Sequence, residues 1–157
     1  MTTGLRRDQM RGFEQKPLVV TDYAQEFTAG SLTTISDSDT WTQVATLSKT
    51  PVRPCLAFIN ASASLRNESL LTGEFSWSAR IQVDGADHPI HVEAARSEGR
   101  IQVPLGLTDE TDRLELTVPW SLTASAHTID LDFLITTVSA GDVLVRNAKL
   151  SLFLLEA

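Results

Sequence analysis

The three histidines are the side chains of this 157-residue sequence best suited to acid–base or metal chemistry. His88 and His91 lie three positions apart, and residues three apart in a strand point to opposite faces of the sheet. No cysteine and no third histidine stands near them in the sequence to complete a zinc site. The pair therefore does not predict a metal centre.

His127 is followed closely by Asp130 and Asp132 at the start of an expected strand. A nucleophilic triad would also need a positioned serine, and no Gly-x-Ser-x-Gly nucleophile elbow occurs in the chain. Scattered serines leave a triad open, because triads are defined by geometry and not by spacing along the chain. The sequence nevertheless favours a protein that is not an enzyme and needs no cofactor.

The acidic clusters and the single cysteine offer no stronger site. Asp37–Asp39 and Asp109–Asp112 could supply oxygen ligands to calcium, but neither has the spacing or the glycine of an EF-hand loop. We interpret both as solvated loops. Cys55 is the only cysteine, so the chain forms no internal disulfide, and its apolar neighbours indicate a small core residue.

The three tryptophans could form a platform on which sugar rings stack. Trp77 falls on the apolar side of an alternating pattern, which predicts a core position. Trp41 and Trp120 stand at the ends of expected strands, where a half-exposed ring is plausible. Burial in a core or an interface is the favoured interpretation for all three.

Alternation of apolar and polar residues is the strongest pattern in the sequence. A period of two places one face of a strand in the core and the other in water. The alternation and weaker strand patterns cover residues 17–23, 42–48, 55–61, 74–84, 90–93, 101–105, 113–118 and 129–136. The expected core residues are Phe75, Trp77, Ile81, Val83, Leu114, Leu116, Ile129, Leu131 and Phe133.

Turn signals separate these segments. Asp84–Asp87 and Ser97–Gly99 are typical of hairpin turns, and residues 108–112 and 140–142 are expected to connect further strands. Only residues 22–29 could form a short helix. Eight or nine strands in a chain without repeats predict an all-β fold, a two-sheet antiparallel β-sandwich of jelly-roll type with an extended N-terminal arm.

Charge divides the chain into two parts. The first 16 residues carry four basic and two acidic side chains, whereas the remainder carries 9 basic and 18 acidic ones. We predict an attachment arm over residues 1–38 and a sandwich domain over residues 39–157. An acidic body repels phosphate backbones, so we expect no nucleic-acid partner. The arm residues expected to dock on another chain are Arg6, Arg7, Arg11, Phe13 and Lys16.

Hydropathy predicts neither a membrane partner nor export. No apolar run approaches the roughly 18 residues needed to span a membrane. The N-terminal arginines are followed by polar residues and not by the apolar stretch of a secretion signal. We therefore expect synthesis in the cytoplasm of the host cell without a signal peptide.

The last expected strand, residues 143–155, is apolar on both faces. Leu150, Leu152 and Leu154 point one way, which we expect to be the core, and Phe153 and Leu155 point the other way. A strand in a two-layer monomer needs only one buried face. Either the N-terminal segment folds back over the second face, or that face is a subunit interface, which we favour. The residues expected to form the oligomer interface are Leu150, Leu152, Phe153 and Leu155.

The order of segments along the chain resembles that of a known protein family. A polar, basic arm precedes a body that begins at Asp39–Ser48, and the chain closes with the two-faced strand Val145–Glu156. This layout resembles the small trimeric jelly-roll proteins of tailed-bacteriophage virions, which include capsid decoration proteins and tail-fibre or spike domains. The resemblance covers about residues 39–157 and implies a homotrimer whose closing strands pack near a three-fold axis. Tumour-necrosis-factor-like trimers share this architecture.

The resemblance implies a non-enzymatic structural protein of a bacteriophage virion, located in the virion, that decorates or stabilises the capsid or forms part of the tail. Its partners would be further copies of itself and other virion proteins of the capsid or tail. The alternative is a carbohydrate- or receptor-binding β-sandwich module, lectin-like or at the tip of a tail fibre.

Overall fold

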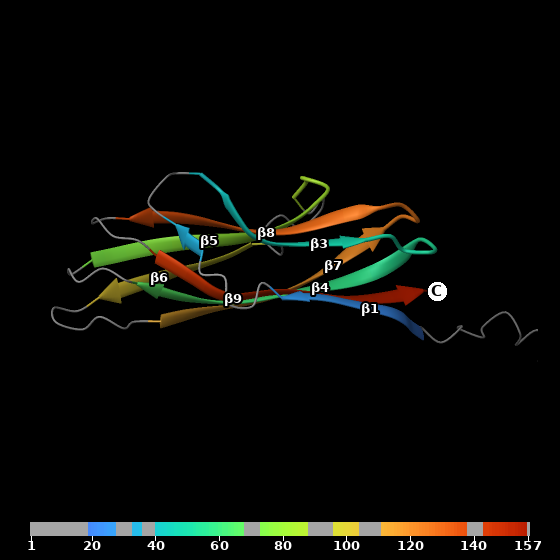
Figure 1. Ribbon diagram of the computed structural model, residues 1–157, viewed down its shortest axis with the longest axis horizontal. Coiled ribbons are helices and arrows are strands. Elements are labelled where there is room, and N and C mark those ends of the chain that lie inside the picture. Colours follow the sequence, from blue (N-terminus) through green and yellow to red (C-terminus); the bar gives the residue numbers. More distant parts are fainter. Residues whose placement is uncertain are drawn as a thin grey trace, which may run out of the picture.

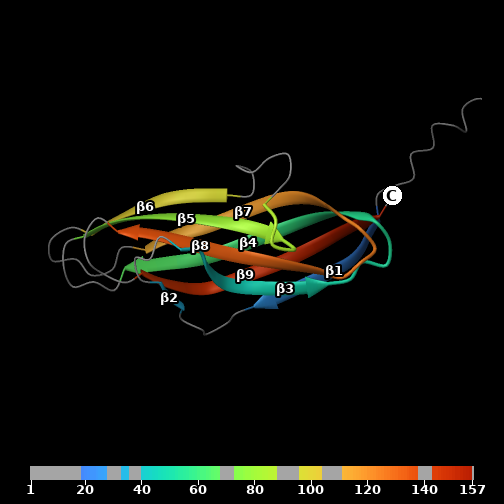
Figure 2. The same ribbon diagram turned by 90° about the horizontal axis from the view of Figure 1, so that it is seen from above.

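The computed structural model describes residues 19–27, 33–35, 40–67, 73–87, 96–103, 111–137 and 143–156. Every regular element within these ranges is a β-strand. The strands form two sheets that lie over one another as two layers (Figure 1), and the strands of both sheets run along the length of the molecule (Figure 2).

The first sheet is built around the long closing strand. Its order is β1 (Val19–Phe27), β9 (Val143–Glu156), β4 (Cys55–Asn67) and β7 (Thr111–Leu122). The short strand β2 (Thr33–Ile35) pairs with the first residues of β9, on a different stretch of β9 from the one that pairs with β1. All pairings in this sheet are antiparallel.

The second sheet has the order β3 (Thr42–Lys49), β8 (His127–Thr137), β5 (Gly73–Val83) and β6 (Arg96–Val103), and it is also antiparallel. From β3 onward the chain changes sheets at every connection except the one between β5 and β6. Because β1 and β2 share one side of β9, each sheet is four strands wide. Two such sheets with a chain that alternates between them have the topology of a double-sheet jelly roll. The predicted all-β jelly-roll sandwich is confirmed.

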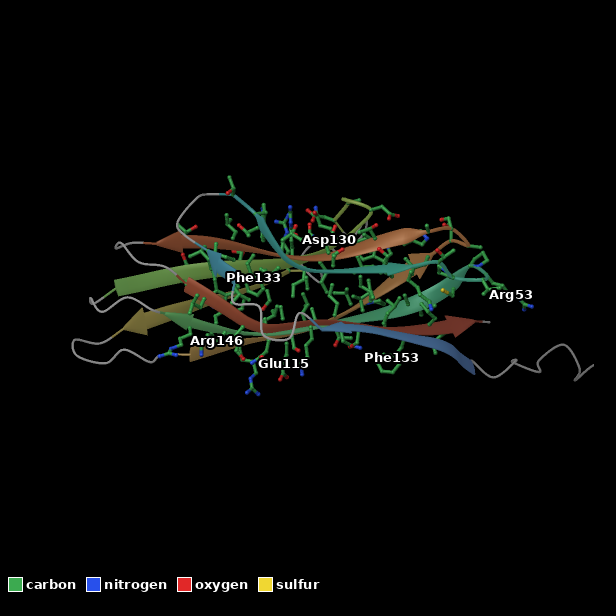
Figure 3. The ribbon with its side chains drawn as sticks, viewed as in Figure 1. Arg53, Glu115, Asp130, Phe133, Arg146 and Phe153 are labelled. Atoms are coloured by element: carbon green, nitrogen blue, oxygen red, sulfur yellow. The ribbon has the colours of Figure 1, made fainter. Side chains whose placement is uncertain are left out.

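The core lies between the sheets and contains the residues that the alternation placed on inward faces. Phe133, Ile59 and Leu131 are fully buried, and Figure 3 shows Phe133 between the two layers. Leu116 is partly buried and packs against the core, and the side chain of Phe75 lies outside the described residues. The other seven expected core residues are buried: Trp77, Ile81, Val83, Leu114, Ile129, Leu131 and Phe133.

Two local predictions differ from the structure. Residues 22–29 were expected as a possible helix, but Val19–Phe27 is strand β1, because β9 offers it an apolar strand to pair with. Ser97–Gly99 was expected as a turn but lies inside β6. Gly99 is opposite Trp77, and a Cβ atom at position 99 would clash with the indole ring. The glycine therefore provides close packing at this position and not a change of chain direction.

The expected boundary between arm and domain at residue 38 also differs from the structure. β1 and β2 both precede residue 38 and are strands of the first sheet. Residues 1–18, including Arg6, Arg7, Arg11, Phe13 and Lys16, lie outside the described residues. The part of the chain that can be an arm separate from the sheet is therefore shorter than expected.

The turn expected at Asp84–Asp87 is confirmed, with Gly85 at φ 75° and a bridge between Val83 and Ala86.

Candidate functional site

Exposed apolar side chains gather at one end of the molecule, where β4 begins and β9 finishes. Val52 is 85% exposed, Phe153 40% and Leu56 37%, and these are the large apolar side chains that are exposed among the described residues. Leu56 pairs with Leu155 and Phe58 pairs with Phe153 across β4 and β9. We call these four paired residues, Leu56, Phe58, Phe153 and Leu155, the end patch; Val52 lies in the connection that leads into β4 at the same end.

The structure divides the expected interface residues between two environments. Leu150 and Leu152 are fully buried in the sandwich core, as Leu154 is, so their inclusion in a subunit interface was wrong. The alternation of β9 sends Phe153 and Leu155 to the outer face of the sheet, where Phe153 is exposed and Leu155 is half-buried. Figure 3 shows the Phe153 side chain pointing away from the layer of side chains that contains Phe133.

A polar hollow lies on the same outer face, beyond the end patch. It has a volume of about 540 Å³ and is lined by Ser62–Ser64 of β4, Arg113 and Glu115 of β7, and Asn147 and Lys149 of β9. A second hollow of about 250 Å³ shares Ser62, Glu115 and Lys149 with the first and extends it to Asn60, Thr117 and Ser151. We call the two hollows together the β4 trough.

The sequence of β4 explains the trough. The outward side chains of β4 are short here, namely Asn60, Ser62 and Ser64, whereas the flanking strands carry the longer Arg113 and Glu115 on β7 and Lys149 on β9. The pairing of β4 with β9 also shifts between Ser62 and Ser64. Asn147, at the shift, has φ 52°, a left-handed conformation that asparagine tolerates. A bulge of this kind bends its strand and increases the local twist beside the trough.

The tryptophans form no shared platform. Trp77 and Trp120 are buried, and the Trp77 Nε1 donates a hydrogen bond to the Asp112 carboxylate at 2.8 Å. Trp41 is half-buried on the other sheet, with the guanidinium carbon of Arg80 4.3 Å and that of Arg96 5.9 Å from its ring centroid. The indole of Trp41 is therefore partly covered by two arginines.

Carboxylates neutralise those two arginines. The Arg80 Nε donates to Asp132 at 3.0 Å, and the Arg96 Nη2 donates to Asp87 at 2.7 Å. Burial raises the pKa of Asp132 above its ordinary value, and this effect outweighs the opposite effect of Arg80. This cluster ties the start of β3 to β5, β6 and β8, and its charges are already paired.

His127 lies at the other end of β8 in an arrangement with the outline of a catalytic triad. Its Nδ1 is 2.7 Å from the Asp84 carboxylate, and its Nε2 is 3.3 Å from the Ser125 hydroxyl. The sequence pointed to Asp130 and Asp132 as neighbours of this histidine. The actual partner, Asp84, is 43 positions away and could not be found from spacing.

Other contacts of the same groups indicate a structural role. The Nε2 of His127 also lies 3.1 Å from the carbonyl oxygen of Thr123, which can only accept a hydrogen bond. The second carboxylate oxygen of Asp84 accepts from the Thr128 amide, and this bond, with the one from His127, lowers the pKa of Asp84. Neither of the hollows that make up the β4 trough is lined by Ser125. The group therefore joins the turn after β5 to the connection between β7 and β8, which crosses from one sheet to the other.

Other candidate residues provide no further site in the structure. Cys55 is buried in the core, as expected. Among the described residues, no group of three or more His, Cys, Asp or Glu side chains is placed to hold a metal ion. His88, His91, Asp37, Asp39, Asp109 and Glu110 lie outside the described residues. The described residues include no helix long and apolar enough to cross a membrane.

No family model and no curated protein matches the sequence. Solved structures do match the fold. A chain of the T13 viral particle of infectious bursal disease virus (IBDV) aligns with a TM-score of 0.52 at 5% identity, over 85% of this chain and 31% of that chain. A chain of the Gx strain of infectious bursal disease virus aligns with a TM-score of 0.51 at 9% identity, over 85% and 33%.

Eiger TNF from S. frugiperda aligns with a TM-score of 0.42 at 10% identity, over 90% of this chain and 94% of that chain. The present chain spans about a third of the length of the two viral chains. At these identities the likeness concerns the fold alone. It shows that the two-sheet sandwich described above is an arrangement also found in chains of a viral particle.

Proposed function

We propose that this chain is a non-enzymatic structural protein of a virion and that copies of it assemble through the end patch. The observation that carries the proposal is the pairing of Leu56 with Leu155 and of Phe58 with Phe153 at one end of a jelly roll, with Leu56 and Phe153 each more than a third exposed. Apolar groups gathered in this way are typical of interaction surfaces. The fold shared with chains of a viral particle supports a role in a particle.

The energetics favour association through this surface. Fully burying one Leu or Phe side chain contributes roughly 1.5–3 kcal/mol, and the residues of the end patch still have part of that gain available. In a closed ring of subunits, this burial free energy is gained at every interface, and no subunit is left with an unused interface surface. We propose a trimer, from the resemblance of the closing strand to those of trimeric jelly rolls in tailed-bacteriophage virions.

The basic N-terminal segment is proposed as the attachment arm to a capsid or tail protein of a bacteriophage. Val19 pairs with Glu156, so the chain enters the first sheet at the same end that carries the end patch. Arg6, Arg7, Arg11, Phe13 and Lys16 precede this entry point. Their charge is opposite to that of the rest of the chain, which leaves them suited to an acidic partner surface.

Phe153→Glu tests the assembly part of the proposal. A carboxylate in the middle of the end patch would need to be desolvated in the interface, so the variant should be a folded monomer in sedimentation-velocity and light-scattering experiments. Thr117→Glu, a substitution on the outer face of β7 outside the end patch, is the matched control and should keep the wild-type mass. A wild-type chain that is monomeric at micromolar concentration would contradict assembly through this surface.

Co-sedimentation tests the virion role separately. The full chain should pellet with empty phage heads or with tails, and a chain lacking residues 1–16 should fold normally but pellet less. Equal pelleting of the two chains would contradict the proposed role of the arm, and pelleting of neither would contradict the virion role.

A further inference from the structure

The turn after β5 contains Asp84 followed by Gly85, the one Asp-Gly pair in the sequence. An aspartate before glycine can close a ring: the amide nitrogen of the glycine attacks the side-chain carboxyl carbon, and a molecule of water leaves. Glycine makes this attack easiest, because it has no Cβ atom to crowd its nitrogen and its backbone rotates freely. The pair is therefore a chemically labile point in the chain.

The turn leaves the nitrogen of Gly85 accessible. Asp84 and Gly85 both have a left-handed backbone, with φ of 53° and 75°. Apart from its chain neighbours, no described atom lies within 4 Å of the position that a Cβ atom of Gly85 would take. The backbone bonds that close the turn join Val83 and Ala86, and no described residue accepts a hydrogen bond from the Gly85 amide. The attacking nitrogen is therefore unhindered.

The carboxylate of Asp84, by contrast, is held in place by strand β8. Its Oδ1 accepts a hydrogen bond from the Thr128 amide at 2.8 Å, and its Oδ2 lies 2.7 Å from the Nδ1 of His127. We call these two bonds the Asp84 latch. Because both oxygens are bonded to β8, the carboxyl group cannot rotate toward the nitrogen of Gly85 unless both bonds break.

The latch also makes the carboxyl carbon less reactive. The departing oxygen leaves as water, so ring closure needs a protonated carboxyl group, and a carboxylate is a poor electrophile. The bonds from Thr128 and His127 lower the pKa of Asp84, which keeps the group ionised at neutral pH. The Asp84 side chain is 50% exposed, so water can reach it whenever the latch opens.

We infer that Asp84–Gly85 is a modification site gated by the Asp84 latch, at which the chain converts to isoaspartate without an enzyme. When the latch opens, the Gly85 nitrogen bonds to the carboxyl carbon of Asp84. Its proton and the carboxyl hydroxyl leave as water, which gives a five-membered succinimide ring. Water then cleaves the ring. Cleavage between the nitrogen and the side-chain carbon restores aspartate, and cleavage between the nitrogen and the backbone carbonyl carbon gives isoaspartate.

Conversion to isoaspartate removes the latch. The backbone gains one methylene group between residues 84 and 85 and the side chain loses one, so the new carboxylate no longer fits both Thr128 and His127. The backbone bond from the Asp84 amide to the Thr128 carbonyl, 2.8 Å long, lies beside the same change. The turn after β5 is then released from β8. The site shares no residue with the end patch or the N-terminal arm.

Ageing of the full chain in neutral buffer tests the inference. Folded wild type and a synthetic peptide of residues 80–90 are incubated together for several weeks, and isoaspartate at position 84 is measured by peptide mapping and mass spectrometry. The peptide lacks the latch and should form isoaspartate at least about tenfold faster, because in the folded chain two hydrogen bonds to a charged group must open first. Equal rates would show that the latch does not gate the site, and a peptide without isoaspartate would show that there is no site.

A variant tests the gate within the folded chain. His127→Leu removes one bond of the latch and should raise the rate by about tenfold, the usual effect of losing a hydrogen bond to a charged group. Ile135→Val, a change in the core near the other end of β8, is the control and should form isoaspartate at the wild-type rate. Circular dichroism checks that both variants are folded, and if His127→Leu is not, the comparison of wild type with the peptide decides. A folded His127→Leu chain with the wild-type rate would overturn the gating.

Discussion

At the scale of single residues, the contact between Trp77 and Gly99 shows how one side chain decides the identity of its neighbour. The indole of Trp77 lies where a Cβ atom of residue 99 would be, and its Nε1 donates to Asp112 of β7. The ring also contacts Phe133, at 5.9 Å between centroids. Trp77 therefore links β6, β7 and β8 from its position on β5.

Trp77→Ala should destabilise the fold strongly. The variant loses a large buried ring and leaves a cavity next to Phe133. The free energy of unfolding in urea should fall by roughly 3–5 kcal/mol, the usual cost of removing a buried aromatic side chain. Ser78→Ala, on the outward face of the same strand, is the control and should change it little.

Asp84 should contribute to stability in a pH-dependent manner. The hydrogen bonds from Thr128 and His127 lower its pKa from 3.8, so its contribution is present above about pH 4 and is lost as the pH falls through the lowered pKa. Asp84→Asn keeps a residue that tolerates the φ of 53° at this position. The stability difference between wild type and this variant should therefore shrink when urea unfolding is measured at pH 5, 4 and 3.

Asp132 should behave in the opposite sense. Burial raises its pKa, so the folded state holds its proton more tightly than the unfolded chain does. Stability contributed by this group falls as the pH rises from about 4 through the raised pKa. The stability of wild type relative to Asp132→Asn should decrease over that range, and an increase would contradict the assignment.

At the scale of elements, the N-terminal strands β1 and β2 cover the side of β9 that faces away from β4. β9 pairs with β4 on one side and with β1 and β2 on the other. Without β1, the residues from Lys149 to Glu156 would present an unpaired edge. Such an edge is a site for pairing with other chains.

Two truncations test this role of β1. A chain that begins at residue 17 retains β1 and should keep the wild-type melting temperature. A chain that begins at residue 28 lacks β1 and should melt at a lower temperature and aggregate, because the backbone groups of β9 lose their partners. If both chains melted alike, β1 would have no part in holding the sheet.

At the scale of the whole molecule, the two outer faces of the sandwich differ. The face of β4, β7 and β9 has the end patch and the trough, whereas the face of β3, β5, β6 and β8 has the paired cluster of Arg80, Arg96, Asp87 and Asp132. Figure 3 shows Glu115 and Phe153 on the outer side of one sheet and Asp130 on that of the other. The first face is the one we expect to contact other molecules.

The molecule should not depend on metal ions for its stability. Its described core is formed by apolar side chains, and the described carboxylates with shifted pKa values are bonded to arginine, histidine or amide groups. Adding a chelator should leave the melting temperature unchanged within a degree or two. A clear decrease would indicate that an acidic segment binds a cation.

The sequence by itself determined which face of each strand is buried. Ile81, Leu114 and Phe133 were predicted to be inward because the direction of a side chain in a strand depends only on its position along that strand. The outward position of Phe153 followed in the same way. The sandwich class could be predicted because alternation is a local signal, whereas the short strand β2 was not expected and the turn expected at Ser97–Gly99 lies inside β6.

The tertiary structure alone decided which strands are neighbours, and therefore which side chains meet. The partnership of His127 with Asp84, the cover of two arginines over Trp41 and the trough along β4 each depend on strands distant in the sequence. Backbone pairing with β9 also made residues 19–27 a strand where the local sequence allowed a helix. Pairing partners are chosen by the free energy of the complete sandwich, to which every strand contributes, and no local pattern contains that information.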